Sequence, residues 1–318
     1  MRTPKKIDLA NIPTPLQKTK FRGNSFYIKR DDFTGVELTG NKVRKLEYLL
    51  HDAQRKKCDY VFTSGGDQSN HARATCIAAT ALGFKSRIFL WGNDKKLPDG
   101  NLFLDKLTGT EIEYLTKKEY KSVLNKMKIS AEALRSENKK AYVIPSGGSS
   151  IVGIWGYINF VKELNQQIDL KRLKGIVFAN GSAGTASGIL LGCAILGINL
   201  KVFPVIVLDT KEKVFEEIRE LSNECSRKYG LGVQPQMNNV EIIDGYSKEG
   251  YKKISPEKIK VIREFFKESG ILLDPTYTGK AFFAYQDLFL NRKKNNDILF
   301  LHTGGIYGAF AKRKNYLD

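Results

Sequence analysis

The chain has 318 residues, enough for one large or two medium domains, and its 42% hydrophobic and 27% charged residues are typical of a protein that folds throughout. These values exclude an intrinsically disordered chain, and the longest apolar run, residues 188–200, is too short to cross a bilayer. The net charge of +18 would permit nonspecific attraction to nucleic acid, but the lysines are spread over several polar segments instead of forming one stripe. Since the N-terminus also lacks an apolar signal core, we expect a cytoplasmic protein with no membrane span and no specific nucleic-acid partner.

Short runs rich in β-branched or aromatic residues alternate with helical patterns along the chain. In the first half the order is a strand at residues 25–32, a helix from Asn41, a strand at 59–65, a helix at 71–84 and a strand at 86–92. In the second half it is a strand at 174–181, a helix at 186–197, a strand at 200–208, a helix at 213–230, and a strand at 296–305 before a last helix. This alternation predicts an α/β fold of open, twisted sheets whose parallel strands are joined by crossover helices.

The four cysteines are scattered, with no CxxC pair and no neighbouring histidine that would complete a zinc site. They are Cys58, Cys76, Cys193 and Cys225. We therefore predict reduced, mostly buried thiols and no bound metal.

Polar, glycine-containing loops follow three of the predicted strands: TSGGDQSNH at residues 63–71, ANGSAGTASG at 179–188 and LHTGG at 301–305. Open α/β sheets bind ligands outside the carboxyl ends of their strands. The three loops therefore predict a binding crevice.

The loop at residues 181–185 leads from a hydrophobic strand into an apolar helix. Its N–H groups can point together at one phosphate, and the hydroxyls of Ser182 and Thr185 can add to them. The spacing is neither a Walker A loop nor a full GxGxxG fingerprint, so a mononucleotide-sized phosphate suits it better. The alternative is a glycine turn that serves strand-to-helix packing alone.

The stretch GNKVRKLEYLL, residues 40–50, places three cations at a helix N-terminus. A helix N-terminus carries a partial positive charge, so this arrangement calls for a bound anion. Lys42 and Lys45 share a helix face, whereas Arg44 points elsewhere. A lysine beside a phosphorylated aldehyde can form a Schiff base, which would make the anion pyridoxal 5'-phosphate. Taken alone, Lys42 would be interpreted as a solvated surface residue, and only the full set of motifs favours the Schiff base.

The ordered set of motifs resembles the fold type II, or tryptophan-synthase-β-like, pyridoxal-phosphate enzymes. Within them it is most similar to the subfamily of 1-aminocyclopropane-1-carboxylate deaminase and D-cysteine desulfhydrase, from about Pro13 to Gly308. The motifs are those at residues 40–50, 63–71, 180–188, 274–281 (DPTYTGKA) and 301–305. The resemblance implies a large cofactor-binding domain, residues 1–46 and 157–318, and a small substrate-binding domain, residues 47–156. It also implies a homodimer.

The resemblance assigns roles to the residues of these motifs. Lys42 would carry the cofactor as a Schiff base and later remove the substrate Cα proton. The cofactor phosphate would be held by Lys45 together with Gly181, Ser182, Ala183, Gly184 and Thr185. Asn70 would hydrogen-bond the ring hydroxyl, and Ser69, Asn70 and His71 would bind the substrate carboxylate. Ser69 would otherwise act in proton transfer, and His71 would otherwise be an exposed residue at a helix start.

Two tyrosines, Tyr277 and Tyr251, match the pair that family members place over cofactor and substrate. The surroundings of Tyr251 depart from the family's usual PxYG pattern, which leaves Tyr246 as a substitute.

Two threonines decide the substrate class that the resemblance implies. Thr278 stands where the deaminase would have glutamate against the pyridine nitrogen, and Thr303 where it would have leucine. A hydroxyl at the ring nitrogen makes a shallower electron sink than a carboxylate does, which suits β-elimination better than cyclopropane opening. The sequence therefore favours an enzyme that converts D-cysteine to pyruvate, hydrogen sulfide and ammonia. The alternatives are a 1-aminocyclopropane-1-carboxylate deaminase, an L-cysteate sulfo-lyase and a non-catalytic ligand- or nucleic-acid-binding protein.

Overall fold

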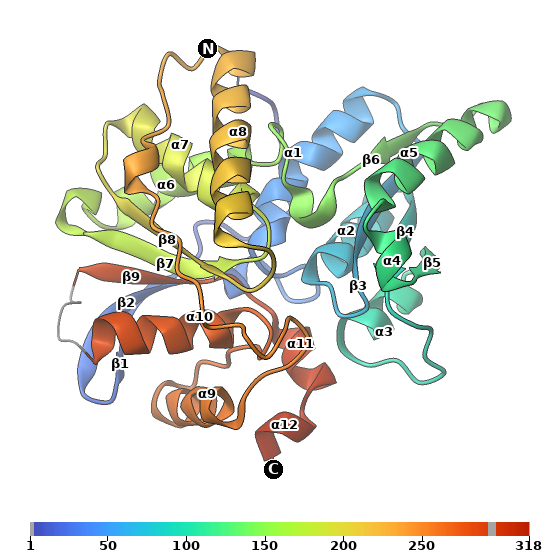
Figure 1. The fold of residues 1–318 in the computed structure, drawn as a ribbon. Helices are drawn as coiled ribbons and strands as arrows, with labels where there is room; N and C mark the ends of the chain where they lie inside the picture. The colour runs from blue at the N-terminus through green and yellow to red at the C-terminus, as the bar shows by residue number, and fades with distance from the viewer. Residues whose placement is uncertain (1–2, 292–296, 318) are drawn as a thin grey trace.

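The computed structural model describes residues 3–291 and 297–317 as two open sheets with helices on their faces (Figure 1). The five-stranded sheet has the order β1-β2-β9-β7-β8, and the four-stranded sheet has the order β5-β4-β3-β6. The strands are β1 (Leu16–Phe21), β2 (Asn24–Arg30), β3 (Tyr60–Gly66), β4 (Lys85–Trp91), β5 (Glu111–Leu115), β6 (Ala141–Val143), β7 (Gly175–Asn180), β8 (Lys201–Ile206) and β9 (Ile298–His302). The helices are α1 (Asn41–Arg55), α2 (Asn70–Ala81), α3 (Gly100–Leu107), α4 (Lys117–Tyr120), α5 (Val123–Ala133), α6 (Trp155–Gln167), α7 (Gly184–Leu196), α8 (Lys211–Tyr229), α9 (Pro256–Ser269), α10 (Thr278–Tyr285), α11 (Ile306–Ala311) and α12 (Lys314–Leu317).

Neighbouring strands are parallel in both sheets, apart from the antiparallel pair β1 and β2. The predicted α/β fold class, with parallel strands and crossover helices, is therefore confirmed. Asn296, the first residue of the strand predicted at 296–305, lies outside the described residues, and β9 begins at Ile298.

The sequence analysis missed β1, which forms a hairpin with β2 around the two-residue loop Arg22-Gly23. Both loop residues have positive φ, 48° and 79°, which is the conformation that fits the twist of a tight hairpin. The strand LQKTKF has exposed lysines at positions 18 and 20 and lies at the sheet edge. Such a polar strand protects the edge from pairing with another chain, and for the same reason it carries a weak hydrophobic signal.

Helices cover both faces of the five-stranded sheet, and its central strand β7 is therefore buried on both sides. Ile176 and Phe178 pack into a core with α6, α7 and α8. Val177 and Ala179, which point the opposite way, pack into a second core with α9 and α10. Figure 1 shows the two helix layers above and below the sheet. The four-stranded sheet is covered in the same way, by α5 over Phe62 and Phe89 and by α1 and α2 over Val61.

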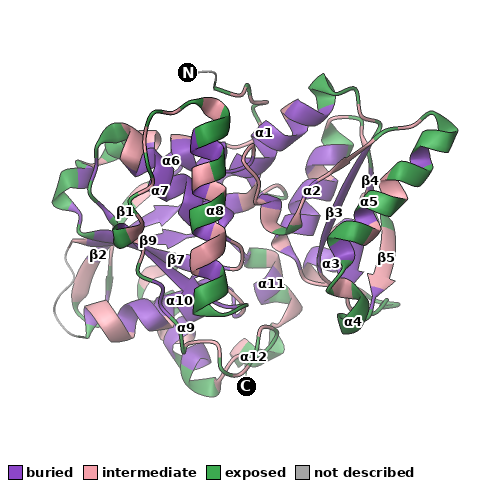
Figure 2. Cartoon of the chain, turned by 45° about the horizontal axis from the view of Figure 1, so that its top comes forward, coloured by how far each residue is buried: buried purple, intermediate pink, exposed green. Residues whose placement is uncertain are grey.

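The outer helices are amphipathic, as Figure 2 shows for α5 and α8, whose outward sides are exposed while the strands behind them are buried. Three of the described cysteines, Cys76, Cys193 and Cys225, are buried and Cys58 is partly buried, as predicted for thiols. Within residues 3–291 and 297–317, no helix combines the length and the apolar character that a bilayer crossing requires.

All strands of the four-stranded sheet lie between residues 47 and 156, and all strands of the five-stranded sheet lie outside that range. We therefore keep the division into residues 1–46 with 157–318 and residues 47–156 as a proposal for the two domains.

The loop after β9 contacts the start of α1 directly. Asn41 N–H donates to the carbonyl of Thr303 at 3.0 Å. Gly304 has φ 95°, and a Cβ there would lie 2.7 Å from Gly40 Cα, so only glycine fits this approach. The packing brings two segments of the predicted crevice, far apart in sequence, to one place.

Candidate active site

A cavity opens between the two sheets, at the carboxyl ends of β3, β7 and β9. It gathers most of the side chains that the sequence analysis singled out, from six separate segments. These are Lys42, Ser69, Asn70, His71, Gly181, Ser182, Tyr251, Tyr277 and Thr303. The cavity is also lined by residues that the sequence analysis did not single out, among them Asn41, Ser64, Trp91, Tyr120, Ser146 and Leu208.

Lys42 lies in the first turn of α1 and lines the cavity. Burial alone lowers the pKa of its amine to about 8. In the part of the chain that the structure describes, no carboxylate lies within ion-pair distance of this amine. A fraction of the amine is therefore neutral at physiological pH, which is the form that acts as a nucleophile or as a base.

Lys45 is fully buried one helical turn further on, and its Nζ donates to the carbonyl of Gly147 at 3.2 Å. A Cβ at position 184 would lie 2.9 Å from this Nζ, so the amine sits against the loop at residues 181–185. Burial and the nearby Lys42 lower the pKa of Lys45 well below its usual value. Two adjacent amines, Lys45 buried and Lys42 partly exposed in the cavity, have no carboxylate partner among the described residues, so they require an anion to be stable as cations.

The loop at residues 181–185 forms a cradle at the start of α7, with hydroxyl groups around it. Gly184 N–H donates to Ser149 Oγ at 3.0 Å, and Ser149 Oγ in turn lies 3.0 Å from Ser182 Oγ. Asn41 Nδ2 donates to Thr185 Oγ1 at 3.2 Å. The sequence analysis missed Ser149, although its SGGSS run is a glycine-serine signal of the kind that marked the other loops.

The first turn of α2 lies on the other side of the cavity. Ser69 is buried, and its Oγ caps the helix by accepting from Ala72 N–H at 3.2 Å. A Cβ at Gly65 would lie 2.4 Å from this serine side chain, so the strand end needs glycine there. The N–H groups at this helix start, together with Ser69, form a suitable place for a carboxylate.

His71 is buried, which overturns the alternative of an exposed residue at a helix start. Thr63 Oγ1 donates to the carbonyl of Ile144 at 3.0 Å, so at 2.9 Å it accepts from Nε2 of His71. Burial and the two lysines lower the pKa of His71 well below its usual value, which keeps the ring neutral. A neutral ring has one N–H, and here Thr63 uses it. The imidazole therefore has no donor left for a substrate carboxylate, and only the main chain of His71 can serve that purpose.

The hydroxyl groups of Tyr251 and Tyr277 hydrogen-bond to each other, and the two rings meet edge to face at 5.6 Å. Burial raises the pKa of both hydroxyls, which keeps them protonated. The ring of Tyr251 stacks on Trp91 at 6.3 Å. Tyr246 instead donates to Asp287 and is not among the described residues that line the cavity, which favours Tyr251 over the substitute.

The two threonines differ in position. Thr303 lines the cavity. Thr278 is fully buried outside the lining, and its hydroxyl donates to Asp274 Oδ1 at 2.8 Å and accepts from Asp274 N–H at 2.9 Å. The expectation that the Thr278 hydroxyl faces a cofactor ring gains no support from this geometry, because the residue lies outside the cavity lining and its one O–H is already donated to Asp274. Asp274 also accepts from Tyr277 N–H and thereby fixes the turn that carries Tyr277.

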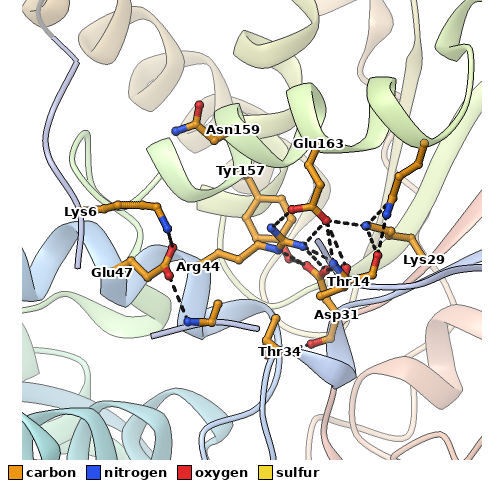
Figure 3. Close-up of polar contacts among 12 residues, drawn as sticks. Lys6, Thr14, Lys29, Asp31, Thr34, Arg44, Glu47, Tyr157, Asn159 and Glu163 are labelled. Carbon is orange, nitrogen blue, oxygen red and sulfur yellow. Dashed lines mark hydrogen bonds and ion pairs between the residues drawn. The ribbon is translucent and has the colours of Figure 1, made fainter. Parts of the chain in front are cut away.

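Arg44 points away from the cavity, as the helix periodicity predicted, and enters a buried ion network (Figure 3). Its guanidinium contacts Asp31 at 2.8 Å and Glu163 at 2.7 Å. Lys29 Nζ lies 2.5 Å from Glu163, and the Tyr157 hydroxyl donates to Asp31 at 2.6 Å. Two cations face two carboxylates, so the network is neutral. It fixes the rotation of α1 about its axis, which directs Lys42 and Lys45 to the opposite side.

These residues fit pyridoxal 5'-phosphate. Lys42 offers an amine for an aldehyde, and Lys45 with the loop at residues 181–185 offers buried positive charge and N–H groups for a phosphate. The fit rests on the two adjacent amines, for which the described residues hold no carboxylate partner, and on the glycine cradle against Lys45.

Comparison with known proteins agrees with this interpretation. The sequence model of a family described as pyridoxal-phosphate dependent enzyme matches residues 7–304. A Thermotoga maritima protein named putative 1-aminocyclopropane-1-carboxylate deaminase is 39% identical, over 97% of this chain and 99% of the relative. The mitochondrial bifunctional D-cysteine desulfhydrase/1-aminocyclopropane-1-carboxylate deaminase of Arabidopsis thaliana is 35% identical, over 96% of this chain and 79% of the relative. A crystal structure described as an ACC deaminase homologue superposes with a TM-score of 0.90 at 38% identity, covering 99% of this chain and 96% of that one.

Proposed function

The chain belongs to the pyridoxal-phosphate-dependent enzymes, in the family of 1-aminocyclopropane-1-carboxylate deaminases and D-cysteine desulfhydrases, and from this premise we propose that it catalyses β-elimination from D-cysteine. Its cofactor is pyridoxal 5'-phosphate. The overall reaction is D-cysteine plus water to pyruvate, hydrogen sulfide and ammonia. It breaks the Cα–H and Cβ–S bonds and later replaces the C–N bond with a C–O bond.

The preference for β-elimination rests on one observation: none of the described residues that line the cavity is a carboxylate. When bound, pyridoxal phosphate takes up charge from Cα, and a carboxylate against the ring nitrogen would deepen that capacity. Cyclopropane opening begins without an α-hydrogen and benefits from the deeper sink. β-Elimination needs less, because the charge leaves with sulfur from Cβ.

The cofactor would be held by four groups of this chain. Lys42 would bind it covalently, and Lys45 with residues 181–185 would bind its phosphate. Asn70 would contact the ring hydroxyl. Ser149 lies in the same cradle, where its hydroxyl accepts from Gly184 N–H, so this N–H would reach a phosphate only by exchanging Ser149 for it.

The lowered pKa of Lys42 supports its role as the base that removes the Cα proton once the substrate amine has displaced it. The substrate carboxylate would be held by Ser69 and the main-chain N–H groups of Asn70 and His71. Tyr251 and Tyr277 would protonate the leaving thiolate. This role is supported by their hydroxyl groups, which stay protonated, and by their position in the cavity. Their hydrogen bond allows one hydroxyl to donate while the other replaces its proton.

A deaminase acting on 1-aminocyclopropane-1-carboxylate is the second candidate, because the Thermotoga maritima relative carries that name. L-Cysteate is a third substrate to test. Lys117 lies over the Trp91 ring at 6.0 Å, near the cavity, where a cation would attract a doubly anionic substrate, whereas Lys252 over the same ring is paired with Asp67 at 2.7 Å.

A substrate panel tests the proposal. Purified holoenzyme would be given D-cysteine, L-cysteine, L-cysteate, β-chloro-D-alanine and 1-aminocyclopropane-1-carboxylate, with sulfide, sulfite and 2-oxo acid as readouts. We expect sulfide and pyruvate from D-cysteine in equal amounts, and neither from the Lys42→Ala variant. Turnover of the cyclopropane substrate alone would contradict the proposal.

A homodimer remains part of the proposal, since the family resemblance implies one. Sedimentation or light scattering on the purified protein measures it directly.

A further inference from the structure

A chain of hydrogen bonds runs from a buried guanidinium to the edge of the cavity. Arg73 Nε donates to Asn101 Oδ1 at 3.2 Å. Asn101 Nδ2 donates to Asn70 Oδ1 at 3.0 Å, and also to the carbonyl of Gln68 at 3.0 Å. Arg73 and Asn101 are fully buried, and Asn70 lines the cavity. The three residues come from α2 and α3, and none of the sequence motifs marked Arg73 or Asn101.

The donor and acceptor at each step of this series of hydrogen bonds follow from the groups involved. The two ends of an amide have nearly the same shape, so the hydrogen-bond partners decide which way it faces. A guanidinium has donors only, so Asn101 must turn its oxygen toward Arg73 and its N–H groups toward Asn70. Asn70 must then accept with Oδ1. The N–H groups of Asn70 are left for the cavity.

The backbone around Asn101 is fixed as well. Its main-chain N–H donates to Gln68 Oε1 at 3.0 Å, and Gln68 Nε2 donates to the carbonyl of Asp99 at 2.9 Å. The amide of Asn101 therefore cannot move away from Arg73 without breaking several bonds.

Arg73 has no carboxylate within ion-pair distance in the described part of the chain. Its other donors go to the carbonyls of Glu37 and Thr39, and the Tyr307 ring lies 5.2 Å from its Cζ. Burial lowers the pKa of Arg73 to about 10, so the side chain is still a cation at neutral pH. The positive charge of Arg73 is not neutralised by an ion pair, so it polarises its hydrogen bond to Asn101. The N–H groups of Asn101, and after them those of Asn70, thereby become better donors.

We propose that Arg73 and Asn101 are positioning residues that hold the amide of Asn70 with its N–H groups toward the cofactor, where they donate to the ring hydroxyl oxygen in its anionic form. This inference rests on the proposed contact between Asn70 and that oxygen. An amide turned the other way would present its carbonyl to the anion and repel it.

Two substitutions at one position separate this role from a structural one. Asn101→Asp keeps the oxygen that accepts from Arg73 but has no N–H to give, so Asn70 must turn its N–H groups toward the introduced carboxylate and its carbonyl toward the cofactor. Asn101→Ala leaves Asn70 free to rotate. We expect cofactor binding, measured by equilibrium dialysis, to weaken about tenfold in Asn101→Ala and about a hundredfold in Asn101→Asp. The visible absorption band of the bound cofactor should shift more in the aspartate variant.

The apoprotein should show the opposite order. Both variants lose the hydrogen bond to the carbonyl of Gln68, but Asn101→Asp gains an ion pair with the buried Arg73, so its unfolding midpoint in urea should equal or exceed that of Asn101→Ala. A purely structural role for Asn101 predicts the same order for stability and cofactor affinity, with the isosteric aspartate the milder change in both. That result would overturn the inference.

A double-mutant cycle with Asn70→Ala separates this inference from the site proposal. Asn70→Ala should itself weaken cofactor binding, and Asn101→Asp should then have no further effect, because no amide is left to turn. If Asn70→Ala weakens binding but Asn101→Asp acts equally in both backgrounds, the positioning role is wrong and the contact of Asn70 stands. If Asn70→Ala leaves binding unchanged, the proposed contact is wrong and the inference fails with it.

Discussion

The hydroxyl groups of Tyr251 and Tyr277 hydrogen-bond to each other in the cavity, one from the loop before α9 and the other from the residue that precedes α10. Tyr277 is held by Asp274, which accepts from its main-chain N–H at 2.9 Å. Tyr251 is held by the stack on Trp91, at the end of β4 in the other sheet. The pair therefore links the two sheets across the cavity.

Replacing either tyrosine by phenylalanine should affect poor leaving groups selectively. In Tyr277→Phe we expect D-cysteine turnover to fall about a hundredfold, because a thiolate leaves faster when it is protonated as the bond breaks. Chloride needs no proton, so turnover of β-chloro-D-alanine should change less than about threefold. The comparison of kcat for the two substrates, in Tyr277→Phe and Tyr251→Phe, checks this. An equal loss for both substrates would show that the tyrosines position the substrate and do not protonate the leaving group.

Burial of the Lys42 amine should make the apoprotein more stable at higher pH. Its pKa is about 8 in the folded chain and 10.5 in the unfolded one, so the unfolded state binds more protons between these values. Stability from this group therefore rises as pH increases from about 8 to about 10.5, by at most about 3 kcal/mol. Lys42→Met should be more stable than the wild type at pH 7, and the difference should shrink toward pH 10. Urea unfolding of both apoproteins at several pH values measures it, and a constant difference would contradict the assignment.

Glu163→Gln should destabilise the fold by about 3 kcal/mol, because it leaves Arg44 and Lys29 buried against one carboxylate (Figure 3). The matched control is Glu132→Gln, whose partner Arg135 is 70% exposed, and whose loss should cost less than about 1 kcal/mol. The network also lowers the pKa of Glu163, so the stability it provides is present at neutral pH and is lost as pH falls through the folded pKa. Urea unfolding at pH 7 and at pH 4 should therefore show the difference between wild type and Glu163→Gln decrease in acid.

Thr278 and Thr303 should respond differently to the same substitution. Thr278→Val removes both hydrogen bonds to Asp274 and should lower the free energy of unfolding by about 1–3 kcal/mol. Thr303→Val removes a hydroxyl from the cavity wall and should change KM or kcat for D-cysteine with little effect on stability. Thermal unfolding and steady-state kinetics of the two variants form the test. A kinetic defect in a stable Thr278→Val protein would restore the expectation that Thr278 contacts the cofactor.

Local sequence patterns were enough to predict β2, β3, β4, β7, β8 and β9, helices that follow several of them, and the loops at their carboxyl ends. The parallel strands β5 and β6 were not predicted. They also predicted that Lys42 and Lys45 share a face and that Arg44 points away, because helix periodicity fixes these directions wherever the helix packs. β1 was missed because an edge strand carries polar residues on its exposed positions.

The partners of individual side chains could not be predicted in this way. His71 was expected to offer its side chain to a carboxylate, but its one N–H is used by Thr63, and Thr278 is similarly engaged with Asp274. Ser149 and Asn101 escaped notice because each acts on a residue at least 31 positions away. Hydrogen bonds of this kind depend on how separate elements dock, and no local pattern encodes them.

The sequence by itself determined the fold class, the cofactor family and the helix that presents the lysines. Hydrophobic periodicity, the placement of glycines and the grouping of charges are set by residues close together in the chain. Only the tertiary structure decided which hydroxyls, amides and ring nitrogens are still available in the cavity. A polar group that is buried must find a partner, and folding chooses that partner from segments that the sequence keeps far apart.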